Sequence, residues 1–135
     1  KEDEKLIFDL LKWMESFSAD YTNTFNDLLD NNILNKKQYK DLRFKEWIYR
    51  WRSRLKEECI PNNKSLALMK KNNPYVIPRN HNIEMIINEA NKKNYIPLYE
   101  LNDVLKNPYK RNKISKKYTL KPNEDEKVLK TFCGT

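Results

Sequence analysis

A cysteine that could do redox chemistry stands third from the end, in the stretch TFCGT at residues 131–135. Gly134 is the only glycine of the chain, and Cys133 is one of two cysteines. We expect the thiol to be accessible, because it follows a long unpatterned segment. Lys130 favours its thiolate form and the terminal carboxylate opposes it. Two interpretations stay open: a frayed terminus with an incidental cysteine, or a redox-capable group on a tether.

A second group of candidate residues lies in the stretch NNPYVIPRNH, residues 72–81. Arg79 follows Pro78, and a guanidinium on a proline-fixed backbone is well placed to bind a carboxylate through two hydrogen bonds. His81 could contact a phosphate or act as a base, but a single histidine near a helix start is more often structural. We expect Arg79, Asn80 and His81 to make structural or interdomain contacts.

No complete catalytic constellation is visible. Loops that cradle phosphates need glycines, and the one glycine is next to last. One histidine and two distant cysteines make no zinc site. Cys59 precedes Ile60, and we interpret it as a small apolar residue shielded at a helix end. We therefore predict no catalytic, cofactor-binding or metal-binding residue in this chain.

The elements that hold these groups are predicted to be helices. The 135 residues fit one domain, and 39% hydrophobic with 12% aromatic residues are enough to build a core. One glycine and six prolines leave few sites for the tight turns of an all-β fold. We predict an all-α fold: an irregular bundle of about five or six helices with an extended basic C-terminal tail.

The clearest predicted helix covers residues 44–55. Its apolar stripe is Phe44, Trp47, Ile48, Trp51 and Leu55. Cations occupy the opposite face, so we expect the tryptophans to pack in a core rather than to stack on bases. Weaker stripes predict helices around residues 6–17, 21–29, 66–69, 83–90 and 97–105, with Asp20 and Asn80 as possible caps and Pro97 in a first turn.

Two segments are predicted to lack helical structure. The two prolines of the stretch at residues 72–81 forbid a helix there and indicate a buried, irregular connector. After Asn107 the sequence turns basic and loses its period, so we expect no helix over residues 109–123. The predicted organisation is a helical domain at residues 1–107 and a basic tail at residues 108–135.

The formal net charge is +8 and the isoelectric point about 9.4. A nucleic acid would suit such a charge, but lysine set among asparagine and isoleucine also arises from AT-rich coding, so we expect no nucleic-acid partner. No apolar run approaches the length of a membrane span, and no signal peptide is visible, so we expect a cytoplasmic protein without a membrane partner.

In this order, ADYTNTF (19–25), WRSRL (51–55), NNPYVIPRNH (72–81), LKNPY (105–109) and terminal TFCGT resemble the C-terminal part of selenoprotein O proteins. The combination of NPxxxPRNH with a CGT end is fairly specific. The resemblance implies a parent protein with a kinase-like core upstream of this chain, which transfers AMP from ATP to Ser, Thr or Tyr hydroxyls of proteins with a divalent metal such as Mg²⁺.

The family's nucleotide- and metal-binding residues lie in that core, so none is carried over to this chain. The resemblance does carry over Cys133, because some members place selenocysteine at this position and others cysteine. It implies the missing core and the parent's protein substrates as partners. The alternative is a stand-alone basic helical module that binds nucleic acid or serves as a structural interaction domain.

Overall fold

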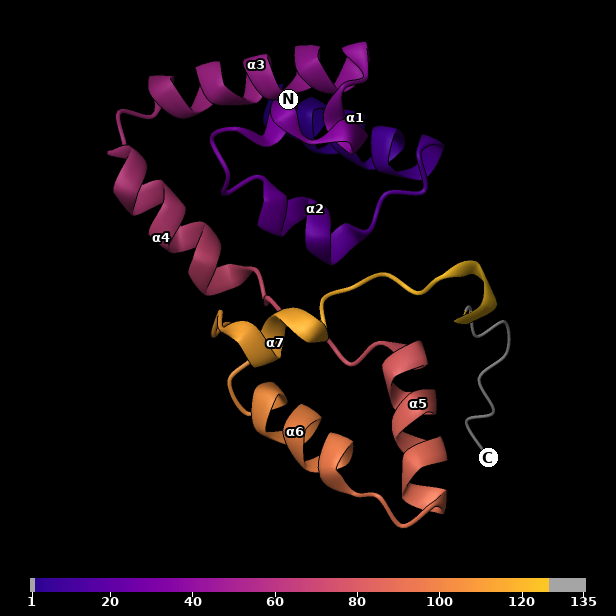
Figure 1. The fold of residues 1–135 in the computed structure, drawn as a ribbon. Helices are drawn as coiled ribbons and strands as arrows, with labels where there is room; N and C mark the ends of the chain where they lie inside the picture. Colours follow the sequence, from indigo (N-terminus) through magenta and orange to yellow (C-terminus); the bar gives the residue numbers. More distant parts are fainter. Residues whose placement is uncertain (1, 127–135) are drawn as a thin grey trace. The chain divides into compact units, whose positions relative to one another are not determined.

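The computed structural model describes residues 2–126, and within them the chain forms helices and no strand (Figure 1). The all-α prediction is confirmed. The α-helices are α1 (Glu2–Ser16), α2 (Tyr21–Asp27), α3 (Leu42–Glu57), α4 (Asn62–Asn72), α5 (Asn80–Asn91), α6 (Ile96–Leu105) and α7 (Lys113–Lys117). Short 3-10 turns are η1 (Ile33–Asn35), η2 (Lys37–Tyr39) and η3 (Glu124–Glu126).

The helices fall into two compact units. Unit 1 covers Lys1–Asn73 and holds α1 to α4, and unit 2 covers Pro74–Thr135 and holds α5 to α7. Each unit has its own core. The core of unit 1 contains Leu10, Trp13, Met14, Leu28, Ile33, Tyr39, Phe44, Trp47 and Ile48, and that of unit 2 contains Val76, Ile86, Leu101 and Tyr118.

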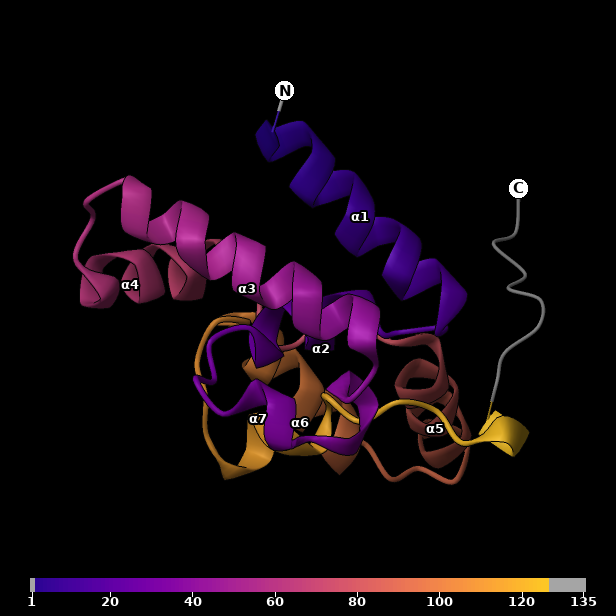
Figure 2. The same cartoon turned by 90° about the horizontal axis from the view of Figure 1, so that it is seen from above.

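In unit 1, α1 packs against α3, and the two helices lie side by side in both views (Figures 1 and 2). The indole of Trp47 donates to the Leu6 carbonyl at 2.8 Å, and the indole of Trp13 donates to Asp41 Oδ1 at 3.1 Å. Asp41 is also the N-cap of α3, so one carboxylate both starts that helix and fixes a core tryptophan. The predicted core position of the tryptophan stripe is confirmed for Trp47, which is buried.

Ion pairs continue the α1–α3 contact along its edge. The guanidinium of Arg50 lies 2.8 Å from Asp9, and that of Arg54 lies 2.8 Å from Asp3. The hydrogen bond from Arg54 lowers the pKa of Asp3. Cations of α3 therefore face acidic residues in the first half of α1.

A buried tyrosine holds together the turns between α2 and α3. The Tyr39 hydroxyl donates to Asp27 Oδ2 at 2.7 Å, and Lys36 Nζ lies 2.6 Å from the other oxygen of Asp27. Burial, and then the bond to Asp27, raises the pKa of Tyr39. The Tyr39 ring packs against Trp13 and Phe44, with centroid distances of 5.7 and 4.6 Å. Tyr39 thus joins the aromatic core, through its ring, to the carboxylate of Asp27, through its hydroxyl.

In unit 2, α5 and α6 diverge from the connection at residues 92–95 (Figure 1). Pro97 stands in the first turn of α6, as predicted. Asp20 caps α2 by accepting from the Asn23 amide at 2.7 Å, which also confirms its predicted role. Asn80 is not a cap: α5 begins at Asn80 itself, with Arg79 at the N-cap position and no side-chain cap bond.

The prediction that residues 109–123 lack a helix is wrong for Lys113–Lys117, which form α7. Asn112 and Ser115 make a reciprocal capping box, with bonds of 2.7 and 2.8 Å between each side chain and the other residue's amide. The segment carries no apolar stripe because a five-residue helix buries only Ser115, and Tyr118 just after it fills the core. Part of the basic segment is therefore folded onto unit 2.

Candidate functional site

The family-like stretches NNPYVIPRNH and LKNPY meet in unit 2. The amides of Tyr75 and Val76 both donate to the Pro108 carbonyl, at 2.8 and 3.0 Å. The Arg111 guanidinium lies over the Tyr75 ring, 4.5 Å from its centroid. Residues 73–79 form no helix, which confirms the predicted irregular connector, but the predicted burial holds only for Val76, because the other residues of the segment are half-buried or exposed. These hydrogen bonds join residues more than 30 positions apart, so the two stretches form one local structure.

The predicted contact residues Arg79, Asn80 and His81 stand where this connector enters α5. Arg79 is half-buried with its Nε atom inside the protein, His81 is half-buried, and Asn80 is exposed. Their predicted interdomain role stays a prediction. Asn82, which the sequence did not single out, is buried, and its amide donates to the Tyr118 carbonyl at 3.4 Å.

A cluster of polar side chains in unit 2 surrounds Glu100. One oxygen of Glu100 accepts from Lys117 Nζ at 2.9 Å and from the Tyr118 hydroxyl at 3.0 Å. The bond from Lys117, followed by that from Tyr118, lowers the pKa of Glu100. Burial, and then Glu100, raises the pKa of Tyr118. This cluster joins α6 to α7 and was missed because Glu100, Lys117 and Tyr118 share no sequence pattern.

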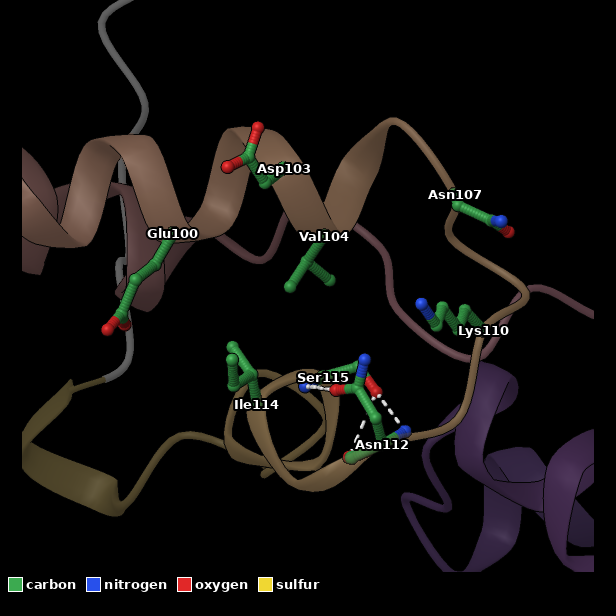
Figure 3. Close-up of a pocket in the computed structure, with 8 residues that line it drawn as sticks. All are labelled: Glu100, Asp103, Val104, Asn107, Lys110, Asn112, Ile114 and Ser115. Atoms are coloured by element: carbon green, nitrogen blue, oxygen red, sulfur yellow. Dashed lines mark hydrogen bonds between the residues drawn. The ribbon is translucent and has the colours of Figure 1, made fainter.

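Beside this cluster lies a pocket of about 320 Å³ between α6 and α7 (Figure 3). Glu100 and Val104 point from α6 toward α7, whereas the carboxylate of Asp103 points away (Figure 3). The capping box of Asn112 and Ser115 forms the opposite side. The acidic groups here are matched by nearby lysines, since Lys106 lies 2.7 Å from Asp103. We find no triad or paired acids in this pocket that would define a reaction.

Unit 1 also contains an apolar groove of about 690 Å³, which we call the α1–α4 groove. Helices α1, α2 and α3 contribute only apolar or aromatic residues to it, including Ile7, Leu10, Phe25, Trp47, Trp51 and Leu55. Helix α4 and its ends contribute Leu68 and Met69 together with polar residues such as Lys64, Ser65 and Asn72. Glu58, which follows the end of α3, also lines the groove, so its lining is mainly apolar with a few charged and polar residues, as in a binding surface.

The predicted redox residue Cys133 lies outside the described residues, and its role stays a prediction. The other cysteine corrects an expectation. Cys59 is exposed rather than shielded, because α3 ends at Glu57 and Cys59 adopts a left-handed backbone with φ 53° in the turn that follows. Its thiol lies 3.7 Å from the Glu57 carbonyl, on the surface.

Within residues 2–126, no group of three or more His, Cys, Asp or Glu side chains is placed to hold a metal ion. None of the helices described there combines the length and the apolar character needed to cross a membrane.

Comparison with known proteins gives the class to which this chain is related. No protein-family model matches it. Over its whole length, however, it is 43% identical to a protein of Nitrosococcus oceani and 41% identical to one of Clostridium perfringens. A protein of Alcanivorax borkumensis is 42% identical over 99% of the chain. All three relatives are protein nucleotidyltransferases.

Each of these three relatives is named protein nucleotidyltransferase YdiU. The predicted resemblance to the selenoprotein O family is thereby confirmed. The chain spans only 28% of the length of each of these relatives.

Proposed function

We propose that this chain is the helical C-terminal portion of a protein nucleotidyltransferase of the selenoprotein O type. The observation that supports this most strongly is identity of about two residues in five along the whole chain, with relatives that are several times longer. In this proposal the remaining part of the protein supplies a kinase-like catalytic core, and the present chain braces that core.

The proposed reaction is transfer of AMP from ATP to a Ser, Thr or Tyr hydroxyl of a target protein. The hydroxyl oxygen forms a bond to the α-phosphorus, the bond from that phosphorus to the bridging oxygen breaks, and pyrophosphate leaves. The hydroxyl proton passes to a base in the core. ATP and a divalent metal such as Mg²⁺ are assigned to the core as well, together with the binding of the protein substrate.

The two units give the chain a supporting role that suits this assignment. The α1–α3 pair of unit 1 is fastened by indole hydrogen bonds and two guanidinium–carboxylate contacts, and the connector of unit 2 is fastened to Pro108. Such fixed elements can hold a neighbouring domain in one position. We propose the cytoplasm as the compartment, where ATP and target proteins are both present.

A nucleotide-transfer assay tests the proposal. The isolated 135-residue chain and a polypeptide that joins it to the remaining part are each incubated with a protein substrate, Mg²⁺ and ATP labelled at the α-phosphate. We expect label to enter protein only with the joined polypeptide. ATP labelled at the γ-phosphate is the matched control, and it should label nothing because that phosphate leaves in pyrophosphate.

Label from γ-phosphate alone would indicate a kinase and contradict nucleotide transfer. Labelling by the isolated chain would contradict the proposed division of roles. Parallel reactions with α-labelled GTP, CTP and UTP identify the nucleotide, and a clear preference for one of these would replace AMP in the proposal.

A stand-alone basic module remains the second candidate. One observation favours it: residues 106–121 hold seven cations, Lys106, Lys110, Arg111, Lys113, Lys116, Lys117 and Lys121, and no acidic residue. Two of these cations, Lys106 and Lys117, are engaged with acidic residues of α6.

A further inference from the structure

The α1–α4 groove exposes apolar side chains at its edges that the core of unit 1 leaves uncovered. Ile7 on its α1 side is 60% exposed, and Leu68 on its α4 side is 61% exposed. Helix α4 itself buries no residue, although Leu66, Leu68 and Met69 are apolar. Contiguous apolar surface of this kind marks an interaction site more often than an isolated exposed side chain does.

The walls of the groove determine what kind of segment can fill it. Most of them are α-helices, whose backbone amides and carbonyls are largely bonded within each helix, and Glu58, Ile60 and Asn73 line the groove from the adjoining turns. Residues 2–126 form no strand, so the groove offers no free strand edge. An extended peptide would bury its own backbone polar groups there without partners, at a cost of a few kcal/mol for each such group. A helix satisfies those groups internally, and presents only side chains.

The distribution of polar residues determines which helix fits. The α1, α2 and α3 sides of the groove are apolar apart from Glu58 just after α3, and the α4 side carries Lys64, Ser65 and Asn72. A matching helix is therefore amphipathic, with large apolar side chains at i, i+3 or i+4, and i+7 toward α1 and α3, and a polar edge along α4. A cavity of about 150 Å³ holds one benzene ring, so about 690 Å³ has room for several such side chains.

We infer that the α1–α4 groove binds an amphipathic helix from the part of the protein that lies outside this chain. The inference rests on the proposed function, because the relatives extend over nearly three-quarters of their length beyond the matched region. A second copy of the chain is the alternative occupant. In a two-fold pair it would have to insert one of its own helices into the groove of the other copy, so that occupancy of the groove would depend on protein concentration.

Alkylation of engineered cysteines tests this assignment without an activity readout. Ile7 lines the groove, and the adjacent Phe8, 65% exposed, does not. Ile7→Cys and Phe8→Cys are made singly in a Cys59→Ser, Cys133→Ser background, both in the isolated chain and in the joined polypeptide. In the joined polypeptide we expect Ile7→Cys to react at least tenfold more slowly than in the isolated chain. The reason is that the reagent can reach this thiol only when the bound helix transiently leaves the groove. Phe8→Cys should react at similar rates in both.

Equal rates for Ile7→Cys in the two proteins would overturn the inference. Protection of Ile7→Cys in the isolated chain would also overturn it. Protection that grows with protein concentration would indicate a second copy in the groove, and protection that does not change with concentration would indicate a bound apolar molecule.

Photo-crosslinking identifies the occupant. A benzophenone amino acid in place of Leu68 is irradiated in the joined polypeptide, and the cross-linked peptides are mapped by mass spectrometry. Cross-links to residues three or four apart outside this chain support a helix. Cross-links to alternate residues, as from a strand, or none outside the chain, overturn the inference.

The same joined polypeptide is assayed for nucleotide transfer, which separates the two proposals. Protection of Ile7→Cys without nucleotide transfer would support a helix bound in the groove and contradict the proposed reaction. Nucleotide transfer with an unprotected Ile7→Cys would support the proposed reaction and contradict the binding of a helix in the groove.

Discussion

Single side chains in this protein do two tasks at once, and Tyr39 shows this most clearly. Its ring belongs to the aromatic core with Trp13 and Phe44, while its hydroxyl donates to Asp27. The same is true of Asp41, which caps α3 and accepts from the Trp13 indole. A substitution at either position therefore removes a polar contact that also fixes the orientation of a core ring.

We predict that Tyr39→Phe lowers the free energy of unfolding by about 1.5 kcal/mol, since the lost hydrogen bond is to a charged acceptor and its ring packing is kept. Tyr39 is 2% exposed; the matched control Tyr49→Phe changes a tyrosine that is 62% exposed, and should change stability by less than about 0.5 kcal/mol. Urea unfolding followed by tryptophan fluorescence reports on unit 1, because Trp13, Trp47 and Trp51 all lie in it. Equal shifts for the two variants would contradict the assigned role of the hydroxyl.

At the scale of elements, short helices depend on their caps more than on their own length. Helix α7 has five residues, too few to be stable in isolation. It is maintained by the capping box between Asn112 and Ser115 and by the anchoring of Tyr118, which bonds to Glu100. The cap therefore determines whether the basic segment of unit 2 is folded.

We predict that Asn112→Ala destabilises α7 by about 1 kcal/mol, because the Ser115 amide loses its acceptor. The Tyr118 amide, which donates to the Ser115 carbonyl, should then exchange its hydrogen about fivefold faster if local opening limits exchange. Asn112→Asp keeps a side-chain acceptor and serves as the control, with exchange close to that of the unchanged chain. Unaltered exchange in Asn112→Ala would mean that Tyr118 alone holds the segment.

At the scale of the whole molecule, the net charge of +8 is spread over both units. Cations of α3 are engaged with acids of α1, and the densest run of basic residues is the segment at residues 106–121. A charge of this size promotes weak association with any polyanion and carries no sequence information by itself.

We predict that DNA binding by the isolated chain is independent of sequence and is lost between about 50 and 200 mM salt, because it comes from counterion release at a few phosphates. Titration of a fluorescent duplex at several salt concentrations measures this. The double variant Lys110→Glu, Lys113→Glu should weaken binding more than Lys12→Glu, Lys45→Glu, which makes the same charge change in unit 1. Tight binding of one sequence at physiological salt would instead favour the stand-alone nucleic-acid-binding module.

The sequence by itself determined the helical class, the tryptophan stripe of α3, the irregular connector and the relationship to selenoprotein O proteins. These features follow from local rules. Apolar residues at helical spacing specify a buried face, prolines forbid a helix, and a rare order of short motifs is readable without coordinates.

Only the tertiary structure decided the rest, because the responsible contacts join residues far apart in the chain. Helix α7 forms where Tyr118 meets Glu100 and Asn82 of other helices, and no local period announces it. Cys59 is exposed because of where α3 ends, which the apolar neighbour Ile60 did not reveal. The α1–α4 groove exists because four helices leave part of their apolar faces uncovered together, and burial of a face is a property of packing rather than of spacing.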